Sequence, residues 1–239
     1  MAKKGLDAYL ITIKSVNMSR FIYFGTPKRI SDLHTPSRIL GKLKREDVKL
    51  AIIDDQDFPY LDILKQHKFN IDTYEDLENL ASLNAYDIIL CDINGVGKKF
   101  SQQYQGAYLV KEIYKLYPFK IIISYTGISF DPRYNEYLKY ADFSVKKDID
   151  SEDWVEKLDK AIDMVANVEK RWNRIRDFLL SNNVSLLNVL LLEDDLVRKI
   201  ERKETQNFPS SKLTVNINED LKQMLISFAG SAAVRLLIP

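Results

Sequence analysis

The sequence contains one cysteine, Cys91, and two histidines, His34 and His67, among 239 residues. A lone cysteine excludes an internal disulfide and any metal site built from several cysteines. Two histidines exclude a histidine-rich metal site. Cys91 stands near the end of an apolar run, which favours a buried cysteine at the end of a strand.

Long apolar runs are also missing. The longest, residues 184–192, is about half of the roughly 20 residues that cross a bilayer, and three acidic residues follow it. Near the N-terminus, the apolar residues 8–13 are interrupted by Lys14 too early for a secretory signal, and no cleavage pattern follows. We therefore expect a cytoplasmic protein with no membrane partner.

The composition is that of a globular chain, with 46% apolar and 29% charged residues. The formal net charge is only +1, but basic residues outnumber acidic ones before Glu46, and the stretch from there to about residue 150 is acidic. Such asymmetry marks either a nucleic-acid-binding arm or a solvated surface that balances an acidic neighbour. No groove-reading motif accompanies the charge, so nucleic acid is the less favoured partner.

The middle of the chain alternates strand-like and helix-like segments. Strands are predicted at residues 48–53, 69–74, 87–92, from 121 and at 141–145, with helical spacing of apolar residues between and after them. This order predicts an α/β fold, a doubly wound five-stranded parallel sheet with helices on both faces. In such open sheets, ligands bind outside the carboxyl ends of the strands.

Two flanks lie outside this core. We predict a basic N-terminal extension over residues 1–47, with a strand pair at 9–13 and 20–24, and an α/β domain over 48–164. Residues 165–239 are predicted to form an additional, mainly helical C-terminal region.

Apolar spacing in the C-terminal region predicts three helices. One long helix is expected to run from Ser151 through Ile175, and others span residues 184–200 and 220–237. Their apolar faces are expected to mediate homodimerisation or to bind a protein partner, or else to pack back on the α/β domain.

Acidic residues follow two of the predicted central strands. Asp54 and Asp55 come after the first strand, and Asp92 ends the third. Like charges held close together cost several kcal/mol at low effective dielectric unless a cation neutralises them. Mg²⁺ suits such a site because it binds carboxylates together with water and phosphate oxygens.

These segments resemble the receiver domains of two-component response regulators. The resemblance is carried by Ile52-Ile53-Asp54-Asp55-Gln56, Asp87 to Asn94, Gly106 with Leu109, Tyr125-Thr126-Gly127 and Phe143-Ser144-Val145-Lys146. It covers nearly half of the chain and implies a flavodoxin-like fold of the receiver type. The match is atypical, because the chain has N- and C-terminal extensions and Lys147 stands where the family usually has proline.

The resemblance implies a role for each acidic residue. Asp92 would be the phosphoacceptor, taking a phosphoryl group from a histidine kinase or a small phosphodonor. Asp54, Asp55 and Asp92, with the backbone carbonyl of Asn94, would hold Mg²⁺.

Further roles follow on the last two strands. Lys146 would pair with the phosphoryl group, with the adjacent Lys147 as its competitor. Thr126 would bond to the phosphoryl group, with Ser124 as the alternative. Phe143 would be the aromatic residue that changes its packing and carries the signal to the surface.

The function implied is a phosphorylation-dependent signalling switch that acts on a protein partner or a dimer interface. Its chemistry would be limited to its own phosphorylation and dephosphorylation. Two alternatives stay open: a degenerate receiver that serves as an interaction scaffold, and a DNA-binding regulator that uses the basic N-terminal segment. The loop from Asp92 to Gly106 is longer than usual in the family, and it would gate the site or bind a partner.

Overall fold

The computed structural model describes residues 26–33, 43–127 and 132–238. Five short strands form one parallel sheet in the order β2-β1-β3-β4-β5. The strands are β1 (Lys49–Ile53), β2 (Asn70–Tyr74), β3 (Ile88–Asp92), β4 (Ile121–Thr126) and β5 (Phe143–Lys146). The doubly wound five-stranded parallel sheet predicted from the sequence is therefore confirmed.

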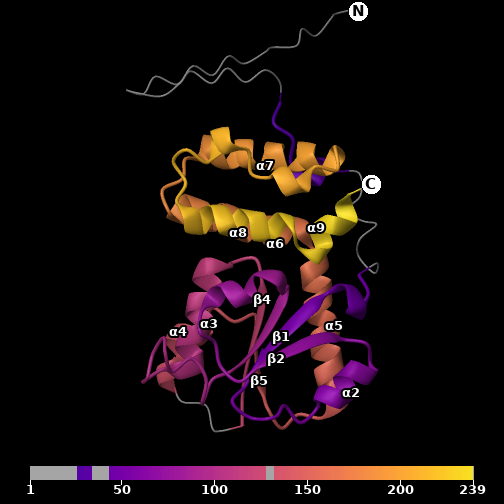
Figure 1. The fold of residues 1–239 in the computed structure, drawn as a ribbon, viewed down its shortest axis with the longest axis vertical. Coiled ribbons are helices and arrows are strands. Elements are labelled where there is room, and N and C mark those ends of the chain that lie inside the picture. Colours follow the sequence, from indigo (N-terminus) through magenta and orange to yellow (C-terminus); the bar gives the residue numbers. More distant parts are fainter. Residues whose placement is uncertain (1–25, 34–42, 128–131, 239) are drawn as a thin grey trace, which may run out of the picture.

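The central strands β3 and β4 are buried along their whole length because helices cover both faces of the sheet. One face carries α2 (Leu61–Gln66) and α5 (Ser151–Ala166), and the other carries α3 (Gln105–Leu116) and α4 (Asn135–Leu138) (Figure 1). The predicted helix between β2 and β3 is a 3₁₀ helix instead, and the described residues contain five further 3₁₀ segments in connections. They span Leu80–Ala85, and then Ile30–Asp32, Arg45–Asp47, Pro132–Tyr134, Thr205–Asn207 and Ser211–Leu213.

The additional helical region predicted at the C-terminus is present. It consists of α6 (Val168–Ser181), α7 (Leu186–Glu201), α8 (Glu219–Ala229) and α9 (Ala232–Leu237). In Figure 1 these helices lie together beyond one end of the sheet, and α5 leads into them. Within the described ranges, no helix is both long and apolar enough to cross a membrane.

Two of the predicted helices are wrong in their extent. The expected helix from Ser151 to Ile175 is broken at Asn167, whose side chain accepts a hydrogen bond from the Lys170 backbone N–H and so caps α6. The expected helix over residues 220–237 is likewise divided. α8 ends at Ala229, and α9 begins at Ala232, after Gly230 and Ser231. Apolar residues continue at helical spacing across both breaks, and therefore the sequence pattern does not reveal them.

The helical region packs against the amino end of the sheet. Buried apolar residues of the sheet and of α6 to α9 form one continuous cluster. A buried ion pair joins the two parts: the Arg171 guanidinium on α6 lies 3.1 Å from Asp87, which precedes β3. The backbone N–H of Ala232 also donates to Asp87, at 3.3 Å. The predicted boundary near residue 164 stays a prediction.

The described part of the N-terminal extension packs on α7. The backbone N–H groups of Lys28 and Ile30 donate to Asp194 and Glu193, at 2.8 and 3.0 Å. Acidic side chains near the middle of α7 therefore bind the backbone of the N-terminal segment, a role that the sequence did not indicate. The strand pair predicted at residues 9–13 and 20–24 lies outside the described residues.

A second buried cation near the same end of the sheet predicts a pH-dependent stability. Burial lowers the pKa of Lys120 from 10.5 to about 7, although the charge of Asp87 opposes this. Its ammonium donates to the backbone carbonyl of Asn84, at 3.0 Å, and to that of Tyr86. Between these pKa values the unfolded chain binds more protons than the folded chain, so the free energy of unfolding is expected to rise with pH.

The rise is expected to be at most about 1.4 kcal/mol per pH unit. Urea denaturation at pH 7 and at pH 9 measures it, with Lys120→Met as the reference because methionine cannot titrate. The wild-type chain should gain stability relative to Lys120→Met over this interval. Parallel pH profiles of the two proteins would show that Lys120 keeps its proton in the folded chain.

Candidate functional site

The acid cluster lies at the carboxyl end of the sheet, where β1 and β3 are neighbours. Asp54 directly follows β1, and Asp92 is the last residue of β3. Each of Asp54, Asp55 and Asp92 offers a carboxylate oxygen, and these oxygens lie within 4.8 Å of one another. Asp54 and Asp92 are buried, whereas Asp55 is exposed. The structure thus brings together the three acidic residues expected at a metal site.

Lys147 places a positive charge against this cluster. Its Nζ lies 2.8 Å from Asp54 Oδ2 and 3.3 Å from Asp92 Oδ2. Burial by itself lowers the pKa of Lys147, but the hydrogen bond and the charge of Asp54 outweigh burial and raise it. The side chain therefore stays an ammonium group at neutral pH.

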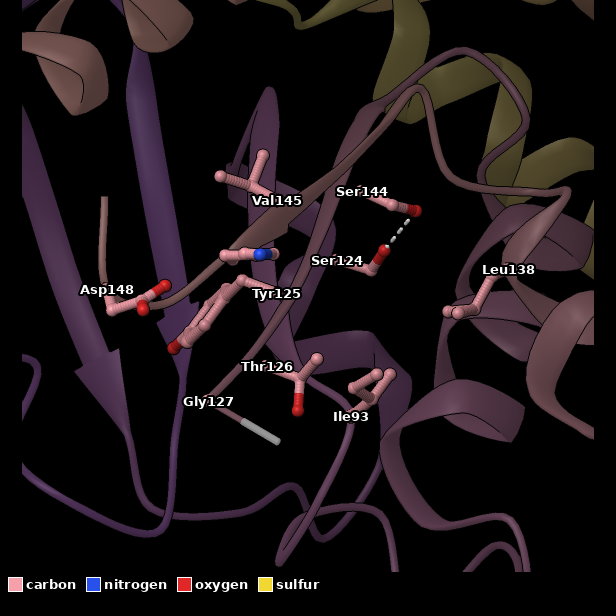
Figure 2. Close-up of a pocket in the computed structure, with 10 residues that line it drawn as sticks. Ile93, Ser124, Tyr125, Thr126, Gly127, Leu138, Ser144, Val145 and Asp148 are labelled. Carbon is pink, nitrogen blue, oxygen red and sulfur yellow. Dashed lines mark hydrogen bonds between the residues drawn. The ribbon is translucent and has the colours of Figure 1, made fainter. Parts of the chain in front are cut away.

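The expectation that Lys146 faces the cluster is wrong. Strand β5 ends at Lys146, whose side chain is exposed and lines the cavity shown in Figure 2. Lys147 is the next residue, and its backbone N–H donates to the Thr126 carbonyl at 2.9 Å. Successive side chains of a strand point to opposite faces, so a shift by one residue selects the other lysine.

The same shift applies to Phe143, which was expected to be the switch aromatic. Phe143 pairs in register with Ile123 and packs against the main core, whereas Ser144 pairs with Ser124. Phe143 stands three residues before Lys146, and Ser144 stands three residues before Lys147. Ser144 therefore stands three residues before Lys147, on the face of β5 that meets Ser124, and the role of Phe143 as the switch aromatic stays a prediction.

Thr126 and Ser124 lie on the same face of β4 but have different partners. The Asn94 side chain donates to the Thr126 hydroxyl at 2.9 Å, and Asn94 lies two residues beyond Asp92. The Ser124 hydroxyl lies 2.8 Å from that of Ser144 and 3.3 Å from the Phe143 carbonyl. Figure 2 shows the two serines pointing toward one another, on the side of Leu138. Thr126 is therefore the hydroxyl at the carboxyl end of the sheet, and Ser124 lies deeper.

Burial and backbone contacts modify Asp92 itself. Burial raises the pKa of Asp92, while the Asn94 backbone N–H, which donates to Oδ1 at 3.0 Å, and the charge of Lys147 lower it. The charge of Asp54 raises it further. Asp92 is thus a desolvated carboxylate with one oxygen bound by a backbone N–H and the other by Lys147. Whether the Asn94 carbonyl is a metal ligand stays a prediction.

The long loop after Asp92 is held in place beside the acid cluster. The Gly95 N–H donates to the Gln105 side chain, and the Gly97 N–H donates to Asp76, both at 2.7 Å. Gly95 has φ +84°, and a Cβ there would lie 2.1 Å from Asp55 Oδ2. Only glycine allows this backbone to pass so close to the Asp55 carboxylate. The anchoring roles of Asp76 and Gln105 were not predicted.

Gly106 allows α3 to begin directly against β3. A Cβ at this position would lie 1.9 Å from the Asp92 carbonyl oxygen. Gly106→Ala is therefore expected to lower the free energy of unfolding by about 1 to 3 kcal/mol, because the backbone of β3 has to shift. Gly230→Ala is the matched control: its nearest contact would be an ordinary 3.6 Å, and a change within about 0.5 kcal/mol is expected. Urea denaturation measures both, and equal stabilities would contradict the prediction.

The carboxylates fit a hard divalent cation. Three carboxylates lie close together and one ammonium group contacts two of them, which leaves excess negative charge, and all of their donor atoms are oxygen, as Mg²⁺ prefers. Cys91, the adjacent soft donor, is fully buried, and burial raises its pKa well above the ordinary value. It therefore stays a thiol and offers no thiolate to a metal.

Among solved structures, this chain is similar to receiver domains. A CheY-like receiver protein from Methanospirillum hungatei JF-1 is 21% identical, with a TM-score of 0.40, over 48% of this chain and 94% of that chain. CheY4 of Vibrio cholerae is 21% identical, with a TM-score of 0.39, over 48% and 98%. NtrX from Brucella abortus is 17% identical, with a TM-score of 0.41, over 65% of this chain and 35% of its own.

No protein-family model matches the sequence, and no curated protein matches it.

Proposed function

We propose that this chain is a phosphorylation-dependent signalling switch whose phosphoacceptor is Asp92. The observation that carries the proposal is the position of Lys147, whose Nζ contacts both Asp54 and Asp92 inside a cluster of three carboxylates. A buried nucleophile, an ammonium group across from it and an open set of oxygen ligands are the parts that phosphoryl transfer to a carboxylate requires.

In the proposed reaction, an Asp92 carboxylate oxygen forms a bond to phosphorus. The bond from phosphorus to the donor breaks, and the electron pair leaves with the donor, either acetate from acetyl phosphate or the imidazole of a histidine kinase. Lys147 neutralises negative charge on the phosphoryl oxygens, and Thr126 donates a hydrogen bond to one of them. Mg²⁺, held by Asp54, Asp55 and Asp92, supplies further charge neutralisation when bound.

We propose that the output is a protein contact. The helices of the C-terminal region bury most of their apolar residues against the sheet and one another. Exposed apolar residues include Leu186 at the start of α7, at 58%, and Val215 in the connection before α8, at 79%, and they offer contacts to a partner or a second copy.

Two basic residues in the described part of the N-terminal segment do not favour the DNA-binding alternative. Lys28 lies 2.6 Å from Glu201, and Arg45 lies 2.6 Å from Asp159, so acidic residues of the chain already neutralise them. Phosphoryl incorporation distinguishes the switch from the scaffold alternative, because only the switch requires it.

Intact-mass spectrometry of the full chain tests the proposal. Incubation with acetyl phosphate and Mg²⁺ is expected to add one phosphoryl group, and chelation of the metal should prevent the addition. Borohydride reduction of the acyl phosphate, followed by peptide mapping, should locate it at Asp92. A chain that stays unmodified with both acetyl phosphate and phosphoramidate, while binding Mg²⁺, would leave the scaffold function in its place.

Two adjacent lysines offer a matched test of the site geometry. Lys147→Ala is expected to slow phosphorylation of Asp92 by about 100-fold or more, because it removes a preorganised positive charge from the reacting oxygens. Lys146→Ala, the same change one residue earlier, should leave the rate within about twofold, since the Lys146 side chain points away from the acid cluster. The initial rate of phosphoryl incorporation measures both. A larger effect at Lys146 would contradict the assignment.

A further inference from the structure

The face of β5 next to Thr126 has no aromatic side chain to couple to the site. Ser144 stands there beside a cavity of about 280 Å³, whose lining includes Ile93, Leu138 and Thr126 (Figure 2). A serine cannot transmit a change by moving a ring. An aromatic side chain does contact the acid cluster, but it lies on the other face of β4.

That side chain is Tyr125, which is 1% exposed. Its hydroxyl donates to Asp54 Oδ2 at 2.9 Å. Asp54 Oδ1 also accepts from the Gln56 backbone N–H at 3.0 Å and from Lys147 at 3.1 Å. Three donors therefore set the orientation of the Asp54 carboxylate, and Tyr125 binds the oxygen that the Gln56 backbone does not.

The Tyr125 ring belongs to a buried aromatic trio. Its centroid lies 5.7 Å from that of Trp154 and 5.6 Å from that of Phe58, and the Phe58 and Trp154 rings are 5.2 Å apart. All three contacts are edge-to-face. Because interiors are close-packed, a ring in such a trio cannot move without displacing its neighbours.

Trp154 links this trio to the rest of the chain. It lies in the first turn of α5, which leads into α6. Its indole Nε1 is buried and has no hydrogen-bond partner within the described part of the chain. The indole is therefore held by packing alone, with no hydrogen bond that fixes it against a shift of the tyrosine ring.

We infer that Tyr125 is a positioning residue that couples the acid cluster to α5: its hydroxyl orients Asp54 toward the metal, and its ring passes a change at Asp54 to Trp154. This inference rests on the proposed metal site. When a cation binds, it shares the Asp54 oxygen that accepts the phenolic hydrogen bond, so this bond weakens and the tyrosine ring shifts. The coupling extends to phosphorylation, but metal binding alone tests it.

Two full-length chains with one tryptophan each make the coupling measurable. Trp172→Phe leaves Trp154 as the reporter, and Trp154→Phe leaves Trp172, which packs against Phe228 in the helical region. Mg²⁺ is expected to change the emission of Trp154 in the first chain and to leave that of Trp172 in the second unchanged. Isothermal titration calorimetry gives the Mg²⁺ affinity independently.

Tyr125→Phe, made in the Trp172→Phe chain, removes only the hydroxyl. It is expected to weaken Mg²⁺ binding by about 10-fold or more, as loss of a residue that orients a ligand does, and to abolish the Trp154 response at saturating Mg²⁺. Tyr60→Phe is the matched control, because the Tyr60 ring also packs against Phe58, with 6.1 Å between the ring centroids. The Mg²⁺ affinity and the Trp154 response should be unchanged in this variant.

The outcomes separate this inference from the proposed function. A Trp154 response that persists in Tyr125→Phe at saturating Mg²⁺, or Mg²⁺ binding without any Trp154 response in the Trp172→Phe chain, overturns the coupling whether or not Asp92 is phosphorylated. The second result does not require Tyr125→Phe to fold. A response that depends on Tyr125 in a chain that acetyl phosphate leaves unmodified supports the coupling and overturns the phosphoacceptor role. Absence of Mg²⁺ binding overturns both.

Discussion

Asp92→Asn is expected to abolish phosphoryl incorporation from acetyl phosphate, because an amide oxygen is too weak a nucleophile to attack phosphorus. Intact-mass spectrometry under the conditions that modify the wild-type chain measures the loss. Asp57→Asn is the matched control, since Asp57 is an exposed acidic residue of the loop after β1. It should accept the phosphoryl group as the wild-type chain does. Incorporation that persists in Asp92→Asn would place the phosphoacceptor elsewhere.

The same substitution should also stabilise the fold when Mg²⁺ is absent. Burial raises the pKa of Asp92, which means that the folded chain disfavours its charged form, and the nearby Asp54 adds to this. An asparagine keeps the acceptor for the Asn94 N–H but carries no charge. Urea denaturation in the presence of a chelator is therefore expected to show a higher midpoint for Asp92→Asn. A lower midpoint would show that the bond to Lys147 outweighs burial.

Arg171→Met is expected to cause the largest loss of stability, about 3 to 5 kcal/mol, because it leaves a buried carboxylate without its partner. The Arg171 and Asp87 side chains are 1% and 5% exposed. The guanidinium also donates to the backbone carbonyls of Phe119, at 3.0 Å, and Val165, at 3.2 Å. A methionine of similar length fills the space but satisfies neither carbonyl.

The double variant distinguishes an unpaired charge from lost packing. Arg171→Met with Asp87→Asn should lose less stability than the sum of the single changes, because the asparagine leaves no buried charge. Arg176→Met is the surface control, since Arg176 and Asp177 are 41% and 69% exposed, and it should change the stability by less than about 1 kcal/mol. Additive losses in the double variant would mean that the two side chains stabilise the fold through packing and not through their opposite charges.

The carboxyl edge of the sheet was predictable because its causes are local. Strands buried on both faces read as continuous apolar runs, and the acidic residues that end them stand directly after those runs, as Asp54 does after Ile53. Parallel strands bring these ends to one edge, and the crowding of Asp54, Asp55 and Asp92 follows from that geometry.

The choice between two adjacent lysines was not predictable in this way. The segment from Phe143 to Lys147 fits the receiver pattern at two offsets, and the alternation of side chains makes a slip of one residue exchange the two faces. The pairing of β5 with β4 decides the offset, since Thr126 pairs with Lys146 and Lys147 follows the strand. The same offset of one residue separates Phe143 from Ser144, which pairs with Ser124.

By itself, then, the sequence determined the order of elements, the parallel sheet and the acidic residues at its edge, because apolar periodicity and the residues that end a strand are properties of neighbouring positions. Only the tertiary structure decided which lysine faces those acidic residues, that Tyr125 binds Asp54, and that Arg171 pairs with Asp87. These contacts join residues far apart in the chain, and their formation depends on strand register and on the packing of helices against the sheet.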